Sequence, residues 1–258
     1  MPLNVDVMVF DSGVGGLSVL EAIRSRLPDL SYCFVGDNAG LPYGDKSESW
    51  LIQRVPHVID CALAEVQCKI LVVACNSAST IVLPPLRSKF TFPVIGVVPA
   101  IKPAAKLSQK KIIGLLATPA TVKRDYTDAL IAEFAAACQV IKLGSSRLVT
   151  IAEEKMRGIP PDREELKLIL APFAVALPDV VVLGCTHFPL LRQEISEILT
   201  DTVWIDSGDA IAERVAHFAI PPSDLSKSGD GAAFFTAPDI SLESLKPFGL
   251  TNLSFLKI

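Results

Sequence analysis

Short apolar runs rich in β-branched residues alternate with stretches of helical pattern along almost all of the 258 residues. The first half reads VDVMVF, GGLSVLEAIRSRL, SYCFVGD, SWLIQRVPHVIDCALAEV, KILVVAC and FPVIGVV, and the second half restarts the alternation at KKIIGLLA. Strands that alternate with helices form βαβ units, whose parallel strands make a sheet that helices cover on both faces. We therefore expect an α/β fold of mainly parallel sheets flanked by helices.

The two halves of the chain share more than this alternation. VMVFDSG precedes VVACNS by 64 positions, counted from Asp11 to Cys75, and IGLLATP precedes VLGCTH by 67 positions, counted from Thr118 to Cys185. LPPLRSKF follows the first cysteine as FPLLRQEI follows the second. This weak internal repeat predicts two pseudo-symmetric α/β lobes with an active site in the cleft between them. The alternative is a chance likeness between ordinary βαβ units.

The expected crossings between lobes lie near residues 96–103 and from residue 205 onward. The first lobe would then comprise residues 1–98 and 208–258, and the second lobe residues 99–207. KSGDGAAFFTAPD, at residues 227–239, is interpreted as a loop that leads into a final short strand and helix.

Charge and hydropathy exclude several classes of partner. The net charge is −4 and the Lys and Arg residues are scattered, so no basic surface for nucleic acid is expected. The N-terminus lacks the pattern of a signal peptide. The most apolar stretch, LILAPFAVALPDVVVLGC, is interrupted by Pro172, Pro178 and Asp179, whereas a membrane span needs about 20 nearly uninterrupted apolar residues. We expect a cytoplasmic protein without membrane contact.

Six cysteines without a secretion signal predict reduced thiols. Cys61, Cys68 and Cys75 are seven positions apart and form no CxxC pair, so neither a structural zinc nor another metal site is expected.

Polar residues gather where the predicted strands end, which is where open α/β sheets bind ligands. They are Asp11, Ser12, Asn76, Ser77, Thr118, Thr121, Thr186 and His187. DSGVGG resembles a phosphate-binding loop, but Ser18 stands where GxGxxG needs its last glycine, and no lysine follows. We expect a tight turn from strand to helix that directs Asp11 into the cleft.

Cys75 and Cys185 each end a predicted strand and precede a candidate helix N-cap, Asn76 or Ser77 in one case and Thr186 in the other. A helix N-terminus stabilises a thiolate, although a free cysteine is more commonly just a small buried apolar residue. That second interpretation suits the cysteines inside apolar patterns, which are Cys33, Cys61, Cys68 and Cys138. Two reactive thiols could form a redox pair, provide one acyl nucleophile, or exchange a proton on opposite faces of a substrate carbon. Only the last option, racemisation, uses both thiols in equivalent roles.

Seven motifs run in order along the chain: FDSGVGGLSVL, PYG at 42–44, ACNSAS, GVVPA, LLATPATV, GCTHFPLL and IDSG. With them the sequence resembles the glutamate racemase family, in the cofactor-independent aspartate/glutamate racemase superfamily. The resemblance implies a homodimer that needs no cofactor and that supplies D-glutamate for peptidoglycan. It further implies that Cys75 is the base toward D-glutamate and Cys185 the base toward L-glutamate. Asp11 would assist Cys75, and His187 with Glu153 would assist Cys185. The implied substrate-binding residues are Ser12, Pro42, Tyr43, Gly44, Asn76, Ser77, Thr118, Thr121 and Thr186.

The sequence departs from the family pattern at two places. Ser77 stands where threonine is usual, and the stretch before Glu153 lacks a cysteine-proline pair. Two alternatives to the glutamate reaction remain: racemisation of aspartate or a related acidic amino acid, and a binding relative without catalysis. His187 after GCT argues against aspartate, because aspartate racemases of the superfamily tend to carry glutamate there. Retention of both cysteines argues against loss of catalysis.

Overall fold

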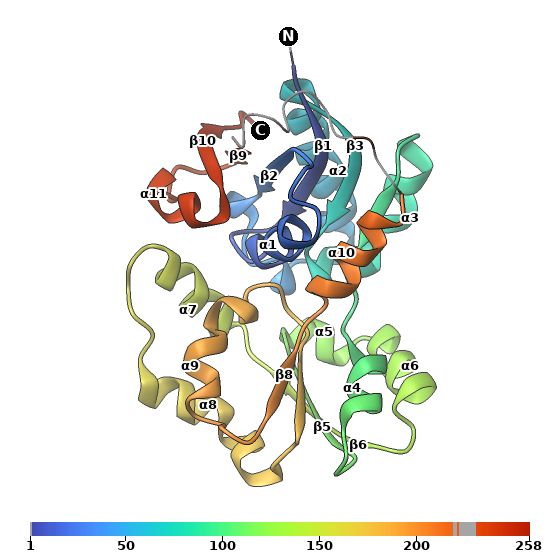
Figure 1. Cartoon of the computed structure of the whole chain (residues 1–258), viewed down its shortest axis with the longest axis vertical. Helices are drawn as coiled ribbons and strands as arrows, with labels where there is room; N and C mark the ends of the chain where they lie inside the picture. The colour runs from blue at the N-terminus through green and yellow to red at the C-terminus, as the bar shows by residue number, and fades with distance from the viewer. Residues whose placement is uncertain (1, 219–220, 222–230) are drawn as a thin grey trace.

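A computed structural model describes residues 2–218, 221 and 231–258 of the chain, arranged around two parallel β-sheets that lie one above the other in Figure 1. The predicted α/β fold with mainly parallel sheets flanked by helices is confirmed. We call the larger sheet with its helices the first lobe and the smaller sheet with its helices the second lobe. Among the described residues, no helix combines the length and the apolar character that crossing a bilayer requires.

The first lobe holds a six-stranded sheet of order β10-β9-β2-β1-β3-β4. Its strands are β1 (Leu3–Asp11), β2 (Tyr32–Gly36), β3 (Val66–Val73), β4 (Val94–Gly96), β9 (Gly231–Phe235) and β10 (Leu250–Phe255). Its helices are α1 (Leu17–Arg26), α2 (Glu48–Glu65), α3 (Asn76–Lys89), α10 (Gly208–Ala216) and α11 (Leu242–Leu245), with the short 3₁₀ turns η1 (Asn38–Gly40), η2 (Tyr43–Asp45) and η5 (Lys246–Phe248).

The side chains of β1 point alternately into two hydrophobic cores, one on each face of this sheet. Val7 and Val9 pack with residues of α1 and α10, whereas Met8 and Phe10 pack with residues of α2 and α3. Successive side chains of a strand point to opposite faces, so a strand covered on both faces is apolar at every position. The sequence VMVF therefore marks β1 as a central strand of a sheet with helices on both sides.

The second lobe holds a four-stranded sheet of order β6-β5-β7-β8. Its strands are β5 (Ile112–Ala117), β6 (Gln139–Gly144), β7 (Val180–Leu183) and β8 (Val203–Ile205). Its helices are α4 (Ile101–Leu107), α5 (Pro119–Lys123), α6 (Asp125–Phe134), α7 (Arg147–Met156), α8 (Arg163–Ala176) and α9 (Arg192–Ser196), with the 3₁₀ turn η3 (Phe188–Leu191).

The order of the four strands in the second lobe repeats that of β2-β1-β3-β4 in the first, and every strand pair in both sheets is parallel. Cys75 stands two residues after the end of β3, and Cys185 stands two residues after the end of β7. The two cysteines therefore occupy equivalent places in two sheets of the same topology.

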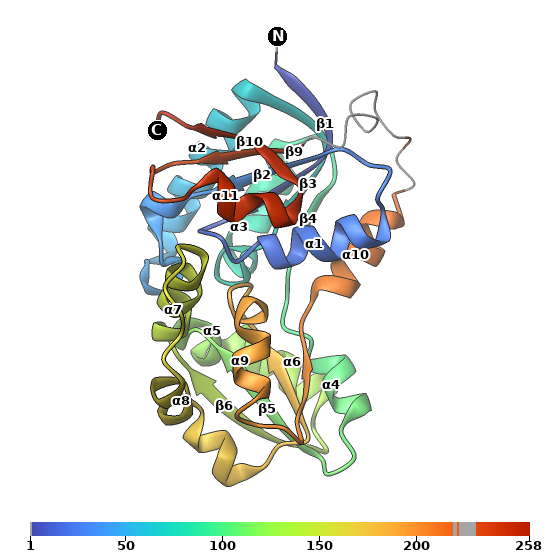
Figure 2. The ribbon, with the colours of Figure 1, turned by 60° about the vertical axis from the view of Figure 1, so that its left-hand side comes forward.

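Two connections join the lobes, the green segment after β4 and the orange segment before α10, and they lie side by side (Figures 1 and 2). The Ser207 hydroxyl of one segment donates a hydrogen bond to the Val98 carbonyl of the other, at 2.5 Å. The exact domain limits at residues 98/99 and 207/208 stay a prediction.

One part of the C-terminal prediction is wrong. Gly231–Phe235, which was assigned to a loop, forms the buried strand β9 between β2 and β10. The five residues GAAFF, all small or aromatic, are enough for a strand when neighbours cover both faces. The start of the predicted loop, residues 227–230, lies outside the described residues.

Candidate active site

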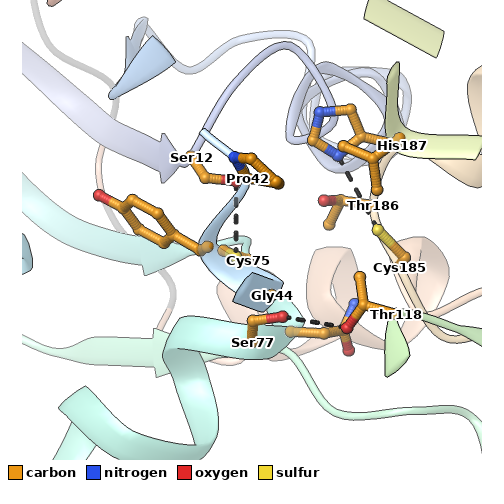
Figure 3. Close-up of a pocket in the computed structure, with 12 residues that line it drawn as sticks. Ser12, Pro42, Gly44, Cys75, Ser77, Thr118, Cys185, Thr186 and His187 are labelled. Carbon is orange, nitrogen blue, oxygen red and sulfur yellow. Dashed lines mark hydrogen bonds between the residues drawn. The ribbon is translucent and has the colours of Figure 1, made fainter. Parts of the chain in front are cut away.

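One pocket between the lobes is lined by both Cys75 and Cys185 (Figure 3). The other residues that line it are Ser12, Pro42, Tyr43, Gly44, Asn76 and Ser77 from the first lobe, and Thr118, Val149, Thr186 and His187 from the second. Cys75 and Cys185 are 5% and 7% exposed, so both thiols face a closed space. The cavity has a volume of about 10 Å³, roughly enough for one water molecule. The lining segments must therefore move apart to admit an amino acid.

Cys75 itself occupies the N-cap position of α3, with φ −71° and ψ 119°. The prediction that Asn76 or Ser77 caps this helix is wrong, because both residues already lie in its first turn. The Cys75 Sγ lies 3.8 Å from Ser12 Oγ and donates a hydrogen bond to it. Burial raises the pKa of Cys75 well above its ordinary value and the charge of Asp11 adds to this effect, while the backbone N–H of Ala78 opposes it. The thiol form is thus favoured at rest.

Asp11 is fully buried at the end of β1 and stands behind the lining residues of the pocket. Its Oδ2 accepts hydrogen bonds from the Gly16 N–H at 2.6 Å and from the Thr186 hydroxyl at 3.1 Å. Its Oδ1 has no hydrogen-bond partner among the described residues. Burial raises the pKa of Asp11, although the charge of His187 opposes the shift. Asp11 can therefore hold a proton close to Cys75.

Cys185, His187 and Glu153 form a chain of contacts. His187 Nδ1 lies 3.9 Å from the Cys185 Sγ, and His187 Nε2 lies 2.7 Å from Glu153 Oε1 (Figure 3 shows the first contact). Glu153 Oε1 also accepts the Val14 N–H of the first lobe at 2.8 Å. The prediction that Thr186 caps a helix is wrong, because η3 begins at Phe188 with His187 as its N-cap.

The charges of His187 and Glu153 support each other. Burial opposes the charged imidazole, but hydrogen bonds with Cys185 and Glu153 hold the pKa of His187 well above its ordinary value. Burial likewise acts to raise the pKa of Glu153, but the hydrogen bond and the charge of His187 lower it. The pair is therefore an imidazolium and a carboxylate, and the imidazolium can stabilise a thiolate at Cys185.

The glycines of DSGVGG allow the first lobe to approach this pair closely. A Cβ added at Gly13 would lie 2.1 Å from Glu153 Oε1, and one added at Gly15 would lie 2.4 Å from His187 Nδ1. Both distances are far below van der Waals contact, so a side chain at either position would displace Glu153 or His187. The motif that resembles a phosphate loop is an interlobe contact in this structure.

Residues 17–215 match the Asp/Glu/Hydantoin racemase family. The chain belongs to this family. Among related racemases, it is 55% identical to glutamate racemase of Shewanella denitrificans over 86% of this chain and 80% of that protein. It is 51% identical to glutamate racemase of Shewanella loihica over 92% of this chain and 90% of that protein.

Solved structures of racemases share the fold as well. The crystal structure of Escherichia coli glutamate racemase, in complex with L-glutamate and the activator UDP-MurNAc-Ala, matches with a TM-score of 0.91 and 46% identity, over 99% of this chain and 98% of that one. Glutamate racemase from Aquifex pyrophilus matches with a TM-score of 0.75 and 32% identity, over 97% of this chain and 98% of that one.

The polar residues around the two cysteines of this racemase are linked by hydroxyl contacts. The Thr118 Oγ1 lies 3.4 Å from Ser77 Oγ and 3.0 Å from Thr121 Oγ1. Thr121 supports Thr118 from behind and does not line the pocket. Asn76 Oδ1 is buried without a hydrogen-bond partner among the described residues, which leaves an acceptor unused at the pocket wall.

Pro42, Tyr43 and Gly44 form one wall, but the Tyr43 hydroxyl is already engaged. It donates to Asp37 Oδ2 at 2.6 Å, and Asp37 also binds the guanidinium of Arg54 at 2.7 Å. Tyr43 therefore contributes its ring and backbone to the pocket rather than its hydroxyl.

Sequence reasoning missed one lining residue, Val149, which comes from α7. It stands four positions before Glu153 and so lies on the same face of that helix. This spacing is visible in LVTIAEE and could have indicated it. Within the described residues, no three His, Cys, Asp or Glu side chains lie together in a way that could hold a metal ion.

Proposed function

We propose that the chain interconverts L- and D-glutamate by moving the proton on Cα between two cysteines, without a cofactor. The observation that carries this proposal is that two thiols, from equivalent positions after β3 and β7, line one closed pocket. The substrate is inferred from relatives named glutamate racemase at 51% and 55% identity and from the L-glutamate in the E. coli complex.

The proposed reaction moves one proton in each half. From D-glutamate, the Cys75 thiolate removes the Cα proton, and the Cys185 thiol then donates its own proton to the opposite face of the carbanion. The product is L-glutamate, and the enzyme is left with a Cys75 thiol and a Cys185 thiolate. From L-glutamate the two cysteines exchange roles.

Fixed dipoles would stabilise the carbanion. A Cα–H is a very weak acid, so charge that develops at Cα and on the carboxylate needs donors already aimed at it in a site without bulk water. The hydroxyls of Ser12, Ser77 and Thr118 supply such donors. Asn76 Oδ1, buried and without a hydrogen-bond partner among the described residues, is suited to accept a hydrogen bond from the substrate ammonium.

Different neighbours would control the protonation of the two thiols. His187, held charged by Glu153, stabilises the Cys185 thiolate directly. Asp11 carries a negative charge when ionised and would raise the pKa of Cys75, so we infer that it acts by holding and relaying a proton.

The biological role follows from the substrate. D-glutamate is a component of peptidoglycan, and its supply in the cytoplasm is the proposed role of this chain. We also infer from the resemblance that the enzyme is a homodimer. Sedimentation equilibrium tests this point against the monomer mass of 27.7 kDa.

The assay follows the circular dichroism of D-glutamate, L-glutamate and D-aspartate with purified protein and no pyridoxal phosphate. Decay of both glutamate signals to zero, with D-aspartate at least about a hundred times slower, is the expected result. A parallel sample contains UDP-MurNAc-Ala, because the E. coli relative was solved with this activator. Faster turnover of D-aspartate, or no turnover of glutamate in either sample, would overturn the proposal.

A further inference from the structure

Arg124 lies where α5 ends and α6 begins, and its backbone is extended there, with φ −77° and ψ 138°. Its carbonyl accepts the N–H groups of Thr127 and Asp128 at the start of α6, so the backbone is fixed. Its side chain leaves this helix pair and reaches α3 in the other lobe. Arg124 therefore belongs to the second lobe but makes its side-chain contacts in the first.

The guanidinium binds the first turns of α3. Its Nη1 donates a hydrogen bond to the Ser77 carbonyl at 3.2 Å and another to the Thr80 hydroxyl. Within the described part of the chain, Arg124 makes no salt bridge, although the charge of Glu48 acts to raise its pKa. The contact thus joins the lobes through hydrogen bonds from a charged donor, which are stronger than those between neutral groups.

Both ends of α5 are held to the same part of α3. Thr118, the N-cap of α5, contacts the Ser77 hydroxyl, and Arg124, just past the end of α5, binds the Ser77 carbonyl. Ser77 lines the pocket and stands two residues after Cys75. If the lobes separate to admit substrate, this pair of contacts must break and then re-form on closure.

The charge of Arg124 also acts on Cys75. The groups around Cys75 that can ionise are Asp11 from β1, Tyr43 from η2, Cys185 and His187 from the segment after β7, and Arg124. Burial and Asp11 both disfavour a Cys75 thiolate. Burial lowers the pKa of Arg124, whereas the charges of Glu48 and of a Cys75 thiolate raise it, so the guanidinium and the thiolate attract each other. His187, the cation that lines the pocket, lies against Cys185.

We propose that Arg124 is a positioning residue that fastens the second lobe onto α3 and supplies positive charge to the Cys75 side of the pocket. The proposal rests on the proposed racemase function. Each cysteine then has its own cation: His187 stabilises a thiolate at Cys185, and Arg124 stabilises a thiolate at Cys75. Because Arg124 belongs to the second lobe, its guanidinium comes near Cys75 only when the lobes are closed.

The test compares Arg124→Gln with Arg124→Lys and with the matched control Lys123→Gln. Lys123 is the exposed neighbour, so its replacement removes the same charge from the same helix end without touching α3. Steady-state kinetics are measured from both enantiomers. We expect kcat/KM of Arg124→Gln to fall at least about tenfold, because hydrogen bonds from a charged donor are lost. The Lys123→Gln variant should equal the wild type.

A second measurement separates charge from structure. The alkylation rate of each cysteine by iodoacetamide is followed from pH 6 to 10 by peptide mass spectrometry, which reports the pKa of Cys75 and of Cys185 separately. We expect the Cys75 midpoint to rise in Arg124→Gln and to stay near the wild-type value in Arg124→Lys, which keeps the charge but not the planar fork. The Cys185 midpoint should not change.

Three results would overturn the inference: kinetics of Arg124→Gln within about twofold of the wild type, a Cys75 midpoint that stays or falls, or an equal shift at Cys185. Each leaves the proposed function intact, because that function is judged on the wild-type protein. A wild type that does not racemise glutamate overturns the proposed function instead.

Discussion

His187 and Glu153 are joined by a 2.7 Å contact between Nε2 and Oε1, with both side chains buried between the lobes. Glu153 reaches His187 from α7, while its Oε1 also accepts an N–H from the DSGVGG loop. One carboxylate oxygen thus fixes the imidazole beside Cys185 and ties the second lobe to the first. This double role predicts that changes at Glu153 alter both the chemistry and the closure of the site.

Replacing Glu153 by Gln should lower the pKa of His187, because the carboxylate that favours the imidazolium is removed. We expect kcat to fall about a hundredfold and the high-pH decline of activity to move to lower pH. Kinetics from pH 6 to 10 measure both effects. Glu154→Gln is the control, since Glu154 binds Arg147 on the outside of α7. An unchanged pH profile in Glu153→Gln would show that Glu153 does not tune His187.

The stability of the protein should depend on the charge of His187. Its folded pKa lies well above the ordinary 6.5, so its contribution to the free energy of unfolding is fully present below pH 6.5 and is lost as pH rises through the folded pKa. The pKa of Glu153 is lowered from 4.5, so the contribution of the Glu153 carboxylate to the free energy of unfolding is present above pH 4.5 and is lost as pH falls below it. Urea unfolding should therefore show that the difference in free energy of unfolding between the wild type and His187→Gln becomes smaller as pH rises above 6.5. A difference that grows would contradict the assigned charges.

Gly13→Ala tests the close approach of the two lobes. The new Cβ would lie 2.1 Å from Glu153 Oε1, so Glu153 must leave its contact with His187 or the DSGVGG loop must shift. We expect a loss of about 1–3 kcal/mol in the free energy of unfolding and an enzyme nearly without activity. Gly158→Ala is the control: its φ of +85° makes alanine costly there, but nothing lies within 4 Å. It should lose stability and keep kcat, and equal activity losses in the two variants would refute the explanation.

Ser77 offers a test of the hydroxyl cluster. Ser77→Ala removes the contact with Thr118 and one donor from the pocket wall, so KM for glutamate should rise about tenfold. Ser77→Thr keeps the hydroxyl and restores the residue that the family usually has there, so its kcat/KM should stay within about threefold of the wild type. The prediction fails if threonine is as harmful as alanine.

Much of the fold was readable from the sequence because its signals are local. Apolar runs such as VMVF and VVVL mark strands buried on both faces, and polar residues directly after them mark the carboxyl edge of a parallel sheet. The equal placement of Cys75 and Cys185 then followed from the repeat. These inferences depend on pattern and spacing alone.

Other features depend on contacts or on backbone geometry that the sequence does not show. Cys75 occupies the N-cap position of α3 without a side-chain capping hydrogen bond, although asparagine and serine, which are usual capping residues, follow it. The Thr186 hydroxyl binds Asp11 across 175 positions, a pairing that only closure of the lobes creates. The strand Gly231–Phe235 is stable because two parallel neighbours flank it, not because of a long β-forming run.

The most direct test of the two-thiol mechanism follows D-glutamate and L-glutamate in D₂O with the wild type, Cys75→Ser and Cys185→Ser. Circular dichroism reports racemisation, and mass spectrometry reports deuterium at Cα. The account predicts that the wild type forms the opposite enantiomer with deuterium at Cα and that each variant loses nearly all of this activity in both directions. Full activity in either variant would remove that cysteine from the reaction and contradict the account.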